Sequence, residues 1–598
     1  MKFSLATTTL LSLIPATFSA CFDISPAFPV PSWPDGNSNL NPALSRIQSR
    51  LGDLVRDARY SNCSFSLELT STTSTLFTAY HTALDHDATR PGDTDVDADS
   101  QYRIASISKV FTTLGILYQH QAGNLSLDDP ITNYIPELTN DDAGEVPWKD
   151  ITLRILASQL SGIPREFAQS DLLNYLPNPT DYGLPPADKE GLPRCDEYDD
   201  YKPCNRSQFL EVLKQSTPVF APNFKSTYSN LNFELLGLAL ENVTGLSYAE
   251  YMQQAIFNPL NMPSTSLSKP DSDSHAVLPP GDNYWDVDEG IQAPTGGIYS
   301  SAADMSKFVR YILTHYNALA TGVNWFNPTS YAAALQNFYG MPFEIFRSTE
   351  VLATKANGGK GRPVTFTTKG GAVPGYYSQI VMLEEYGLGF TFLVAGVETG
   401  SELLTKLRDL VTVEIVREAE EAIWSSISES HAGAYAAEKE TGLNSSISFT
   451  ASPSTGLVVE RFISNGTDVI NGPLPAMVAP ALATEGAGLR LQMMPTLLFK
   501  DEREKKGEIW RMMVLLNRQE KGGEGGLGED EGDGVFGEMC LTDVDYALYA
   551  GHPINEVVFW HGEGEGEQTV VELPAWGVKM ARVGSDKSGE RDGWRVDL

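Results

Sequence analysis

Apolar residues recur at helical spacing along most of the first 430 residues. Leu44, Ile47, Leu51 and Leu54 would share one face of a helix over residues 41–59. The same spacing predicts further helices over residues 106–123, 152–162, 229–245, 248–260, 301–316 and 402–428. Alternating apolar and polar positions predict strands over residues 63–78, 377–383 and 388–394. Strands at both ends with helices between them predict an α+β domain whose sheet joins the beginning of this region to its end.

The pattern changes near residue 430, where short alternating segments replace helical spacing. These segments predict strands over residues 448–450, 457–463, 489–499, 510–516 and 557–560. Glycine and glutamate dominate residues 522–534 and 562–566, which is typical of solvated loops. The 598-residue chain also exceeds the roughly 250–300 residues at which single cores stop growing. We therefore predict an α+β domain over residues 21–430 and a β-rich C-terminal domain over residues 431–598.

The first 20 residues have the pattern of a cleaved signal peptide. Lys2 precedes an apolar stretch around Leu10 and Ile14, and the small residues Ser19 and Ala20 follow. This predicts a secreted, extracellular protein. The net charge of −34 argues against a nucleic-acid partner and against binding to an anionic membrane surface. No later run reaches the roughly 18 apolar residues that a membrane helix needs.

Five cysteines would fold in an oxidising compartment. Cys195 and Cys204 share one polar, loop-like segment and are predicted to form a disulfide. A pairing of Cys21 with Cys63 stays open, which would leave Cys540 as the odd thiol. The Cys and His spacings match no metal site, and we expect neither a metal nor a cofactor. Glycosylation sequons lie at Asn62, Asn124, Asn205, Asn242, Asn444 and Asn465.

Ser106-Ile-Ser-Lys109 is a Ser-x-x-Lys pattern at the start of a predicted helix. Residues three apart share a helix face, so the Lys109 amine can reach the Ser106 hydroxyl. An amine with a lowered pKa can then remove the hydroxyl proton and activate the serine as a nucleophile. A second copy, Ser266 to Lys269, meets Pro270 and cannot open a helix.

Two further patterns follow Ser106 in the chain. Tyr228-Ser-Asn230 precedes a predicted helix, and its phenol could shuttle protons while its amide binds a lysine and a substrate carbonyl. Lys369-Gly-Gly371 leads towards the strand from Tyr377 and could place positive charge beside a developing oxyanion. Both patterns have a second copy. The Tyr-x-Asn copy at residues 60–62 precedes Ser106, and the Lys-x-Gly copy at residues 521–523 lies in an acidic, glycine-rich loop with no strand after it.

The ordered set Ser-x-x-Lys, Tyr-x-Asn and Lys-x-Gly resembles the serine β-lactamase and penicillin-binding-protein family, in particular class C β-lactamases and secreted fungal β-lactamase-like proteins. Other segments add to the resemblance, namely residues 123–129, 161–164, 235–237, 293–297 and 375–376. It covers about residues 40–420 and implies an antiparallel sheet flanked by helices. It also implies that Ser106 is the nucleophile and that Lys109 and Tyr228 relay its proton. The implied substrate-binding positions are Asn230, Lys369, Gly371 and Ala372.

The resemblance implies a serine hydrolase that cleaves an ester or amide in a small molecule or peptide through an acyl-enzyme. Two alternatives stay open, namely acyl transfer onto a metabolite and a catalytically silent binding protein. Gly370 replaces the Thr or Ser whose hydroxyl usually helps to bind a substrate carboxylate, so β-lactam recognition is not expected. Gln159 stands where many relatives have His. The oligomeric state and the role of the C-terminal domain are not determined by these patterns.

Overall fold

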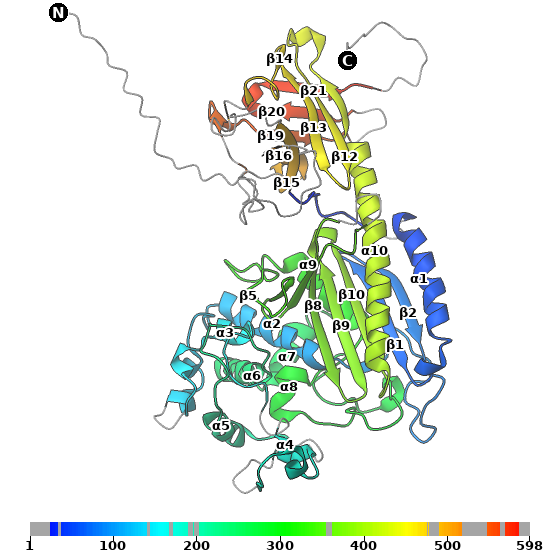
Figure 1. Cartoon of the computed structure of the whole chain (residues 1–598), viewed down its shortest axis with the longest axis vertical. Helices are drawn as coiled ribbons and strands as arrows, with labels where there is room; N and C mark the ends of the chain where they lie inside the picture. Colours follow the sequence, from blue (N-terminus) through cyan, green and yellow to red (C-terminus); the bar gives the residue numbers. More distant parts are fainter. Residues whose placement is uncertain are drawn as a thin grey trace, which may run out of the picture. The chain divides into compact units, whose positions relative to one another are not determined.

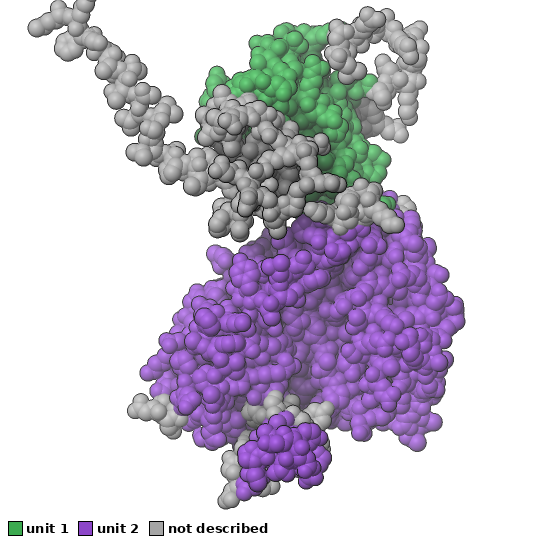
Figure 2. Space-filling model, in the orientation of Figure 1, with its two compact units in different colours: residues 1–29, 420–598 green, residues 30–419 purple. Residues whose placement is uncertain are grey.

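The computed structural model describes residues 24–33, 38–139, 144–166, 171–188, 195, 202–353, 361–474, 477, 489–516, 544, 547–562 and 568–584 (Figure 1). It divides into two compact units (Figure 2). One unit comprises residues 30–419, and residues 1–29 and 420–598 are assigned to the other. The predicted signal peptide, Cys21, Cys540 and the Lys-Gly-Gly copy at residues 521–523 lie outside the described residues.

The sheet of the 30–419 unit has eight strands in the order β2-β1-β10-β9-β8-β7-β6-β5, with antiparallel neighbours throughout. The strands are β1 Ser64–Ser71, β2 Thr75–His81, β5 Ser330–Tyr331, β6 Asn337–Tyr339, β7 Glu344–Ser348, β8 Val364–Val373, β9 Tyr376–Leu383 and β10 Leu388–Ala395. β1 pairs with β10 from Ser64 opposite Ala395 to Ser71 opposite Leu388. This pairing confirms the predicted α+β fold, in which the sheet joins the beginning of the domain to its end.

Helices cover both faces of this sheet, since β1 and β10 are buried along their whole lengths. The helices are α1 Asn41–Leu54, α2 Ser108–Gln121, α3 Leu153–Ala157, α4 Leu172–Tyr175, α5 Arg206–Lys214, α6 Leu231–Thr244, α7 Tyr248–Met252, α8 Ala293–Gly296, α9 Ala302–His315 and α10 Gly400–Ser430. α9 packs on β1 and β10, where a side chain at Gly389 would overlap Val309. α1 and α10 lie side by side, joined by ion pairs from Arg46 and Arg50 to Glu414 (Figure 1).

Two predictions from the periodicity need correction. The helix expected over residues 152–162 ends at Ala157, because Gln159 takes a positive φ of 60° and turns the chain. Lys369 to Ala372 do not precede a strand but lie inside β8, which was not predicted because Gly370 and Gly371 are unfavourable in strands. The glycines nevertheless keep their place in the ladder, with Gly371 opposite Ser378 of β9.

The other unit contains a nine-stranded antiparallel sheet in the order β12-β11-β21-β20-β19-β16-β15-β13-β14. The strands are β11 Gly433–Ala436, β12 Ser446–Ser452, β13 Gly456–Ser464, β14 Thr467–Asp468, β15 Leu489–Asp501, β16 Lys506–Leu516, β19 Glu556–Trp560, β20 Val570–Leu573 and β21 Val578–Arg582. An additional pairing of β12 with β13 closes the sheet into a barrel and leaves β14 outside the ring. Apolar residues including Tyr435, Phe449, Trp510 and Phe559 fill its core. The β-rich character predicted for this region is confirmed.

Among the described residues, no helix combines the length and the apolar character that crossing a bilayer requires. α10 is the longest of the helices given above, but its sequence carries many charged residues.

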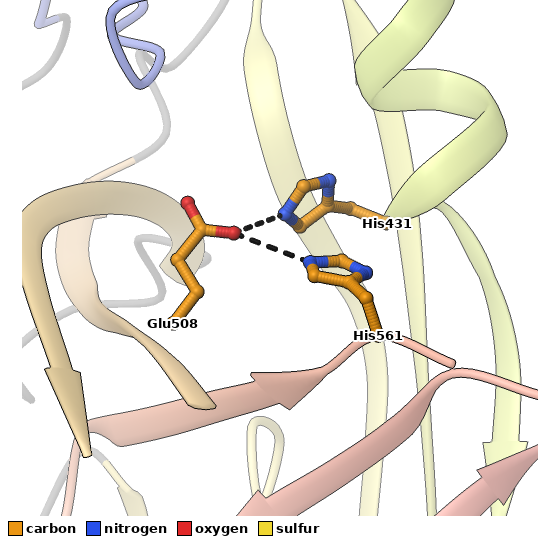
Figure 3. A group of neighbouring side chains, drawn as sticks. All are labelled: His431, Glu508 and His561. Atoms are coloured by element: carbon orange, nitrogen blue, oxygen red, sulfur yellow. Dashed lines mark hydrogen bonds and ion pairs between the residues drawn. The ribbon is translucent and has the colours of Figure 1, made fainter. Parts of the chain in front are cut away.

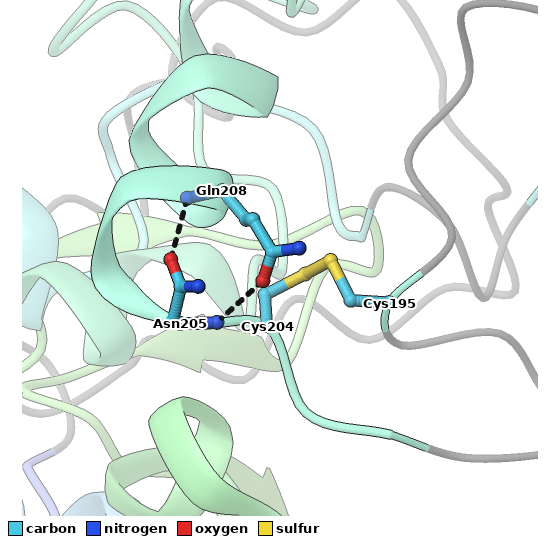
Figure 4. Close-up of a disulfide and its surroundings, with 4 residues drawn as sticks. All are labelled: Cys195, Cys204, Asn205 and Gln208. Carbon is cyan, nitrogen blue, oxygen red and sulfur yellow. Dashed lines mark hydrogen bonds between the residues drawn. A yellow bond between two sulfur atoms is a disulfide. The ribbon is translucent and has the colours of Figure 1, made fainter.

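A disulfide joins Cys195 and Cys204, the pair predicted from the sequence (Figure 4). Cys204 comes directly before Asn205, which begins α5. The Asn205 side chain accepts a hydrogen bond from the Gln208 backbone, and the Gln208 side chain accepts one from the Asn205 backbone. The disulfide therefore joins Cys195 to a capped helix start. Cys63 keeps a free, buried thiol that contacts Thr399 Oγ1.

Candidate active site

Ser106 lies in a short 3₁₀ turn, Ala105–Ile107, that runs directly into α2. Ala105 takes a φ of 46°, a left-handed conformation that costs free energy for a residue with a Cβ. The turn packs against β8 and β9, and Ser378 Oγ of β9 donates a hydrogen bond to the Ile104 carbonyl at 2.7 Å. The sheet therefore holds the strained turn that presents the Ser106 hydroxyl.

Lys109 occupies the first turn of α2, and its side chain is fully buried. Its ammonium nitrogen donates to Ser106 Oγ at 3.0 Å and to the Thr295 carbonyl at 2.9 Å. Burial lowers the pKa of Lys109, and the positive charge of Lys369 lowers it further, against the opposing effect of Tyr228. A buried lysine with a lowered pKa can exchange a proton with the serine it contacts.

Tyr228 comes from the loop before α6 and reaches the same oxygen from the other side. Its hydroxyl donates to Ser106 Oγ at 2.9 Å. Three cations surround its ring, with Arg165 at 4.6 Å, Lys109 at 5.1 Å and Lys369 at 5.2 Å from the ring centre. Burial by itself would raise the pKa of Tyr228, but the charges of Lys109 and Lys369 lower it to about 8. The phenol can therefore ionise close to neutral pH.

Lys369 projects from β8 and is almost fully buried. Its ammonium group lies 2.8 Å from a carboxylate oxygen of Glu344 on the neighbouring strand β7. Burial would lower the pKa of Lys369, but the negative charges of Glu344 and Tyr228 raise it. Lys369 is thus held as a cation beside Tyr228. Sequence analysis missed Glu344, because a single Glu in an unpredicted strand carries no motif.

Gly371 and Ala372 lie on the part of β8 that faces the Ser106 turn. A Cβ at Gly371 would overlap the Ile104 carbonyl oxygen and lie 2.9 Å from Ser106 N. Only glycine therefore permits this approach of strand and turn. Ser106 and Ala372 line one cavity of about 280 Å³, together with Arg165, Glu166, Asn230 and others. The structure thus brings together every catalytic and substrate-binding position that the sequence indicated.

The Asn230 side chain, however, makes no hydrogen bond with Lys109. Its amide nitrogen donates to a carboxylate oxygen of Glu166, and its backbone carbonyl accepts a hydrogen bond from Thr295 Oγ1 at 3.1 Å. The side-chain oxygen of Asn230 is buried and has no hydrogen-bond partner among the described residues. Glu166 was also missed by the sequence analysis. Both side chains border the cavity, where Asn230 can meet a substrate.

Gln159 explains how the Tyr228 loop is held. Its side-chain oxygen accepts hydrogen bonds from the Ser229 backbone N–H and from Asn232 Nδ2, both at 2.8 Å. Its backbone carbonyl accepts a third from Thr227 N at 2.9 Å. Gln159 is therefore a positioning residue that fixes the loop on both sides of Tyr228. Its unusual identity was visible in the sequence, but this contact was not.

The second copies of the motifs do not form a comparable site. Lys269 pairs with Asp286 at 2.6 Å, while Ser266 Oγ donates to the Ser268 carbonyl. Tyr60 donates to Glu402 at 2.8 Å and lies in a 3₁₀ turn. Among the serines that the structure describes, only Ser106 accepts hydrogen bonds from both a lysine and a tyrosine on its side-chain oxygen.

Comparisons with known proteins match both parts of the chain to β-lactamase-like proteins. The profile of the β-lactamase family matches residues 72–413, and a profile described as a β-lactamase-like C-terminal domain matches residues 424–584. Solved class C β-lactamases match 64% of this chain and 98% of theirs at 17% identity, with a TM-score of 0.47.

Three curated fungal proteins match nearly the whole chain. "Probable hydrolase M10" from Phoma sp. is 30% identical over 96% of this chain and 93% of its own length. "Probable hydrolase clz13" from Cochliobolus lunatus is also 30% identical, over 96% of this chain and 93% of its own length. A "Beta-lactamase-like protein" from Arthroderma benhamiae is 29% identical over 95% of this chain and 96% of its own length.

Proposed function

The chain belongs to the β-lactamase family of hydrolases, and on that premise we propose that it is a secreted serine hydrolase that cleaves an ester or amide through an acyl-enzyme on Ser106. One observation carries the proposal. Ser106 Oγ accepts hydrogen bonds from Lys109 at 3.0 Å and from Tyr228 at 2.9 Å, and both donors have lowered pKa values. A serine contacted by two such groups has the bases that a hydroxyl nucleophile needs.

Acylation begins when Ser106 Oγ attacks the substrate carbonyl carbon. The hydroxyl proton passes to the ionised Tyr228 oxygen along the existing 2.9 Å contact. The backbone N–H groups of Ser106 and Ala372 donate to the oxyanion, and the Lys369 charge stabilises it from within the site. The carbon–oxygen or carbon–nitrogen bond then breaks, and the leaving group takes the proton from Tyr228.

Deacylation uses the same groups in the reverse direction. Water attacks the acyl carbonyl while Tyr228, with Lys109 beside it, accepts a water proton. The bond to Ser106 Oγ breaks, the serine oxygen takes a proton back, and the carboxylic acid product leaves. Because Lys109 and Tyr228 both contact Ser106 Oγ, either group can return the proton.

The substrate is an ester or amide without a carboxylate beside the scissile bond. Gly370 supplies no hydroxyl for such a group, and Glu344 already pairs with Lys369. A β-lactam, which carries a carboxylate, is therefore disfavoured.

Secretion is supported by the signal-peptide pattern and by the Cys195–Cys204 disulfide, a bond typical of oxidising compartments. The glycosylation sequons fit the same route. Among them, Asn124, Asn205, Asn242, Asn444 and Asn465 are exposed. The side-chain nitrogens of Asn124 and Asn242 already donate hydrogen bonds, to Gln119 Oε1 and to the Tyr134 carbonyl.

Active-site labelling tests the nucleophile. A fluorophosphonate probe should label the purified protein, and mass spectrometry should map the adduct to Ser106. Ser106→Ala should abolish labelling, while Ser266→Ala, in the second Ser-x-x-Lys copy, should leave it unchanged. An adduct on another serine, or equal labelling of Ser106→Ala, would overturn the assignment. Turnover of aryl esters or amides but not of a chromogenic cephalosporin would support the proposed substrate class.

A further inference from the structure

Two histidines and one glutamate meet in the barrel unit, outside the site around Ser106 (Figure 3). His431 follows the end of α10, Glu508 lies in β16, and His561 directly follows β19. One Glu508 carboxylate oxygen lies 3.0 Å from His431 Nε2 and 3.3 Å from His561 Nε2. Each of the three residues offers one nitrogen or oxygen atom, and these three atoms all lie within 4.8 Å of one another.

The hydrogen bonds of His431 show which ring nitrogen carries its proton. Ser430 Oγ donates its single hydrogen to the Ser426 carbonyl at 2.7 Å. The same oxygen lies 2.8 Å from His431 Nδ1 and can therefore only accept there, so Nδ1 must carry the proton. In neutral His431 the Nε2 atom then carries no proton, and its lone pair faces a carboxylate oxygen of Glu508. Two acceptors 3.0 Å apart repel each other, and either a proton on Nε2 or a bound cation between them removes that repulsion.

The spacing of these atoms suits a tetrahedral metal centre. With metal–ligand bonds of about 2.0–2.1 Å, neighbouring ligand atoms of a tetrahedron lie about 3.3–3.4 Å apart. The two distances from the Glu508 oxygen, 3.0 and 3.3 Å, are close to this edge. The remaining edge joins the two histidines and can be adjusted by rotation of His561, whose side chain is 38% exposed. His431 and Glu508, with 7% and 12% exposure, form the fixed side.

The surroundings hold His431 in place in the way that metal ligands are usually held. Its Nδ1 has the Ser430 partner, and its ring packs against Trp510 at 5.2 Å and Phe559 at 4.7 Å. Arg582 donates to the backbone carbonyls of Glu429 and Ala432, on either side of His431.

We propose that His431, Glu508 and His561 form a binding site for a divalent transition-metal ion of the zinc class. Imidazole nitrogens and one carboxylate suit zinc, whereas calcium and magnesium prefer sites made of oxygen atoms alone. Three protein ligands leave one position for water or another small ligand, and the exposed His561 gives access from solvent. The site is independent of the proposed hydrolase reaction, since none of the three residues belongs to the cavity at Ser106.

No motif could have revealed this site, because its residues lie on three segments far apart in the chain. His431 and His561 are 130 positions apart in number, and pairing of β16 with β19 places Glu508 opposite Phe559, two residues before His561. The expectation that the protein has no metal site rested on the spacing of Cys and His along the chain, which does not report such a cluster.

Metal binding to the full-length protein tests the proposal. After treatment with a chelator and dialysis, the protein should bind one Zn²⁺ per chain in calorimetric titration. Co²⁺ in the same position should give visible d–d absorption. Glu508→Gln and His561→Ala should each weaken Zn²⁺ binding by more than about 100-fold, because loss of an outer-shell partner alone costs about 10–100-fold. His552→Ala removes an exposed histidine of the same unit and should leave binding unchanged.

Two outcomes would overturn the proposal. One is the absence of stoichiometric Zn²⁺ binding to the wild type. The other is equal binding by wild type, Glu508→Gln and His561→Ala, which would place the ion elsewhere. His561→Ala changes a partly exposed residue, and circular dichroism checks that it folds. Fluorophosphonate labelling of Ser106 should not change in these variants, so failure of the metal site and failure of the hydrolase proposal can be told apart.

Discussion

The Lys369 ammonium group donates a hydrogen bond to the Glu344 carboxylate at 2.8 Å, from strand β8 to strand β7. Burial alone would lower the pKa of Lys369, and Glu344 makes the largest contribution that raises it above its ordinary value of 10.5. This ion pair keeps a cation beside Tyr228, where the pKa of the phenol is lowered to about 8. The protonation of Lys369 and of Tyr228 is therefore coupled to a carboxylate that belongs to neither motif.

Removing that carboxylate should change the pH dependence of activity. In Glu344→Gln the pKa of Lys369 should fall, because burial is no longer opposed by a negative charge. Above the new pKa the cation is lost, so kcat/KM should decline at an alkaline pH where the wild type stays active. The control Glu350→Gln removes an exposed glutamate and should keep the wild-type profile. Identical profiles for all three proteins would contradict the role given to Glu344.

Ionisation of Tyr228 should appear in the acylation rate. As pH rises through about 8, the fraction of phenolate grows, so kcat/KM should rise and then level off. Tyr228→Phe removes the group that ionises, and we expect kcat to fall by about 10²–10⁴-fold. The rise of kcat/KM near pH 8 should also disappear. Tyr331→Phe changes an exposed tyrosine and serves as the control. A wild-type profile without a limb near pH 8 would argue against the phenolate as the base.

Gln159 should affect both stability and catalysis through the loop it holds. Gln159→Ala removes the acceptor for Ser229 N and Asn232 Nδ2 and leaves both buried donors without it. We expect the free energy of unfolding to fall by about 1–3 kcal/mol for this loss. Because the loop carries Tyr228, kcat should fall more than KM rises. The measurements are denaturant unfolding and steady-state kinetics, with the exposed Gln215→Ala as control. Unchanged kcat would show that the loop holds its position without Gln159.

The disulfide should contribute to stability without entering the reaction. Its two cysteines are nine residues apart, and closing a loop of this length is worth about 2–3 kcal/mol in the chain-entropy account. The double variant Cys195→Ala/Cys204→Ala should lose about 2–3 kcal/mol of stability and melt at a lower temperature. Labelling of Ser106 should persist. A thiol reductant should lower the melting temperature of the wild type and leave that of the double variant unchanged. A reductant effect of equal size in both proteins would point to another bond.

The proposed catalytic residues could be identified from the sequence because each motif keeps its members within three positions. Local spacing then reports a shared helix face or turn, as for Ser106 and Lys109. Residues that act from another element leave no such trace. Glu344 precedes Lys369 by 25 positions and meets it only through strand pairing. The same reason hides the closure of the barrel, since alternating residues predict β12 and β13 but not their place in a ring.

Gly370 and Gly371 are neighbours in the sequence, and the structure predicts opposite responses when each is replaced by alanine. A Cβ at Gly371 would overlap the Ile104 carbonyl oxygen and lie 2.9 Å from Ser106 N, so it would push β8 away from the serine turn. A Cβ at Gly370 would meet nothing closer than Glu344 Oε2 at 3.8 Å, which is ordinary contact. Gly371→Ala should therefore reduce kcat/KM by at least about 100-fold, the cost of a lost oxyanion donor. Gly370→Ala should remain within a few-fold of the wild type, and similar losses in both variants would mean that Gly371 does not set the distance between β8 and Ser106.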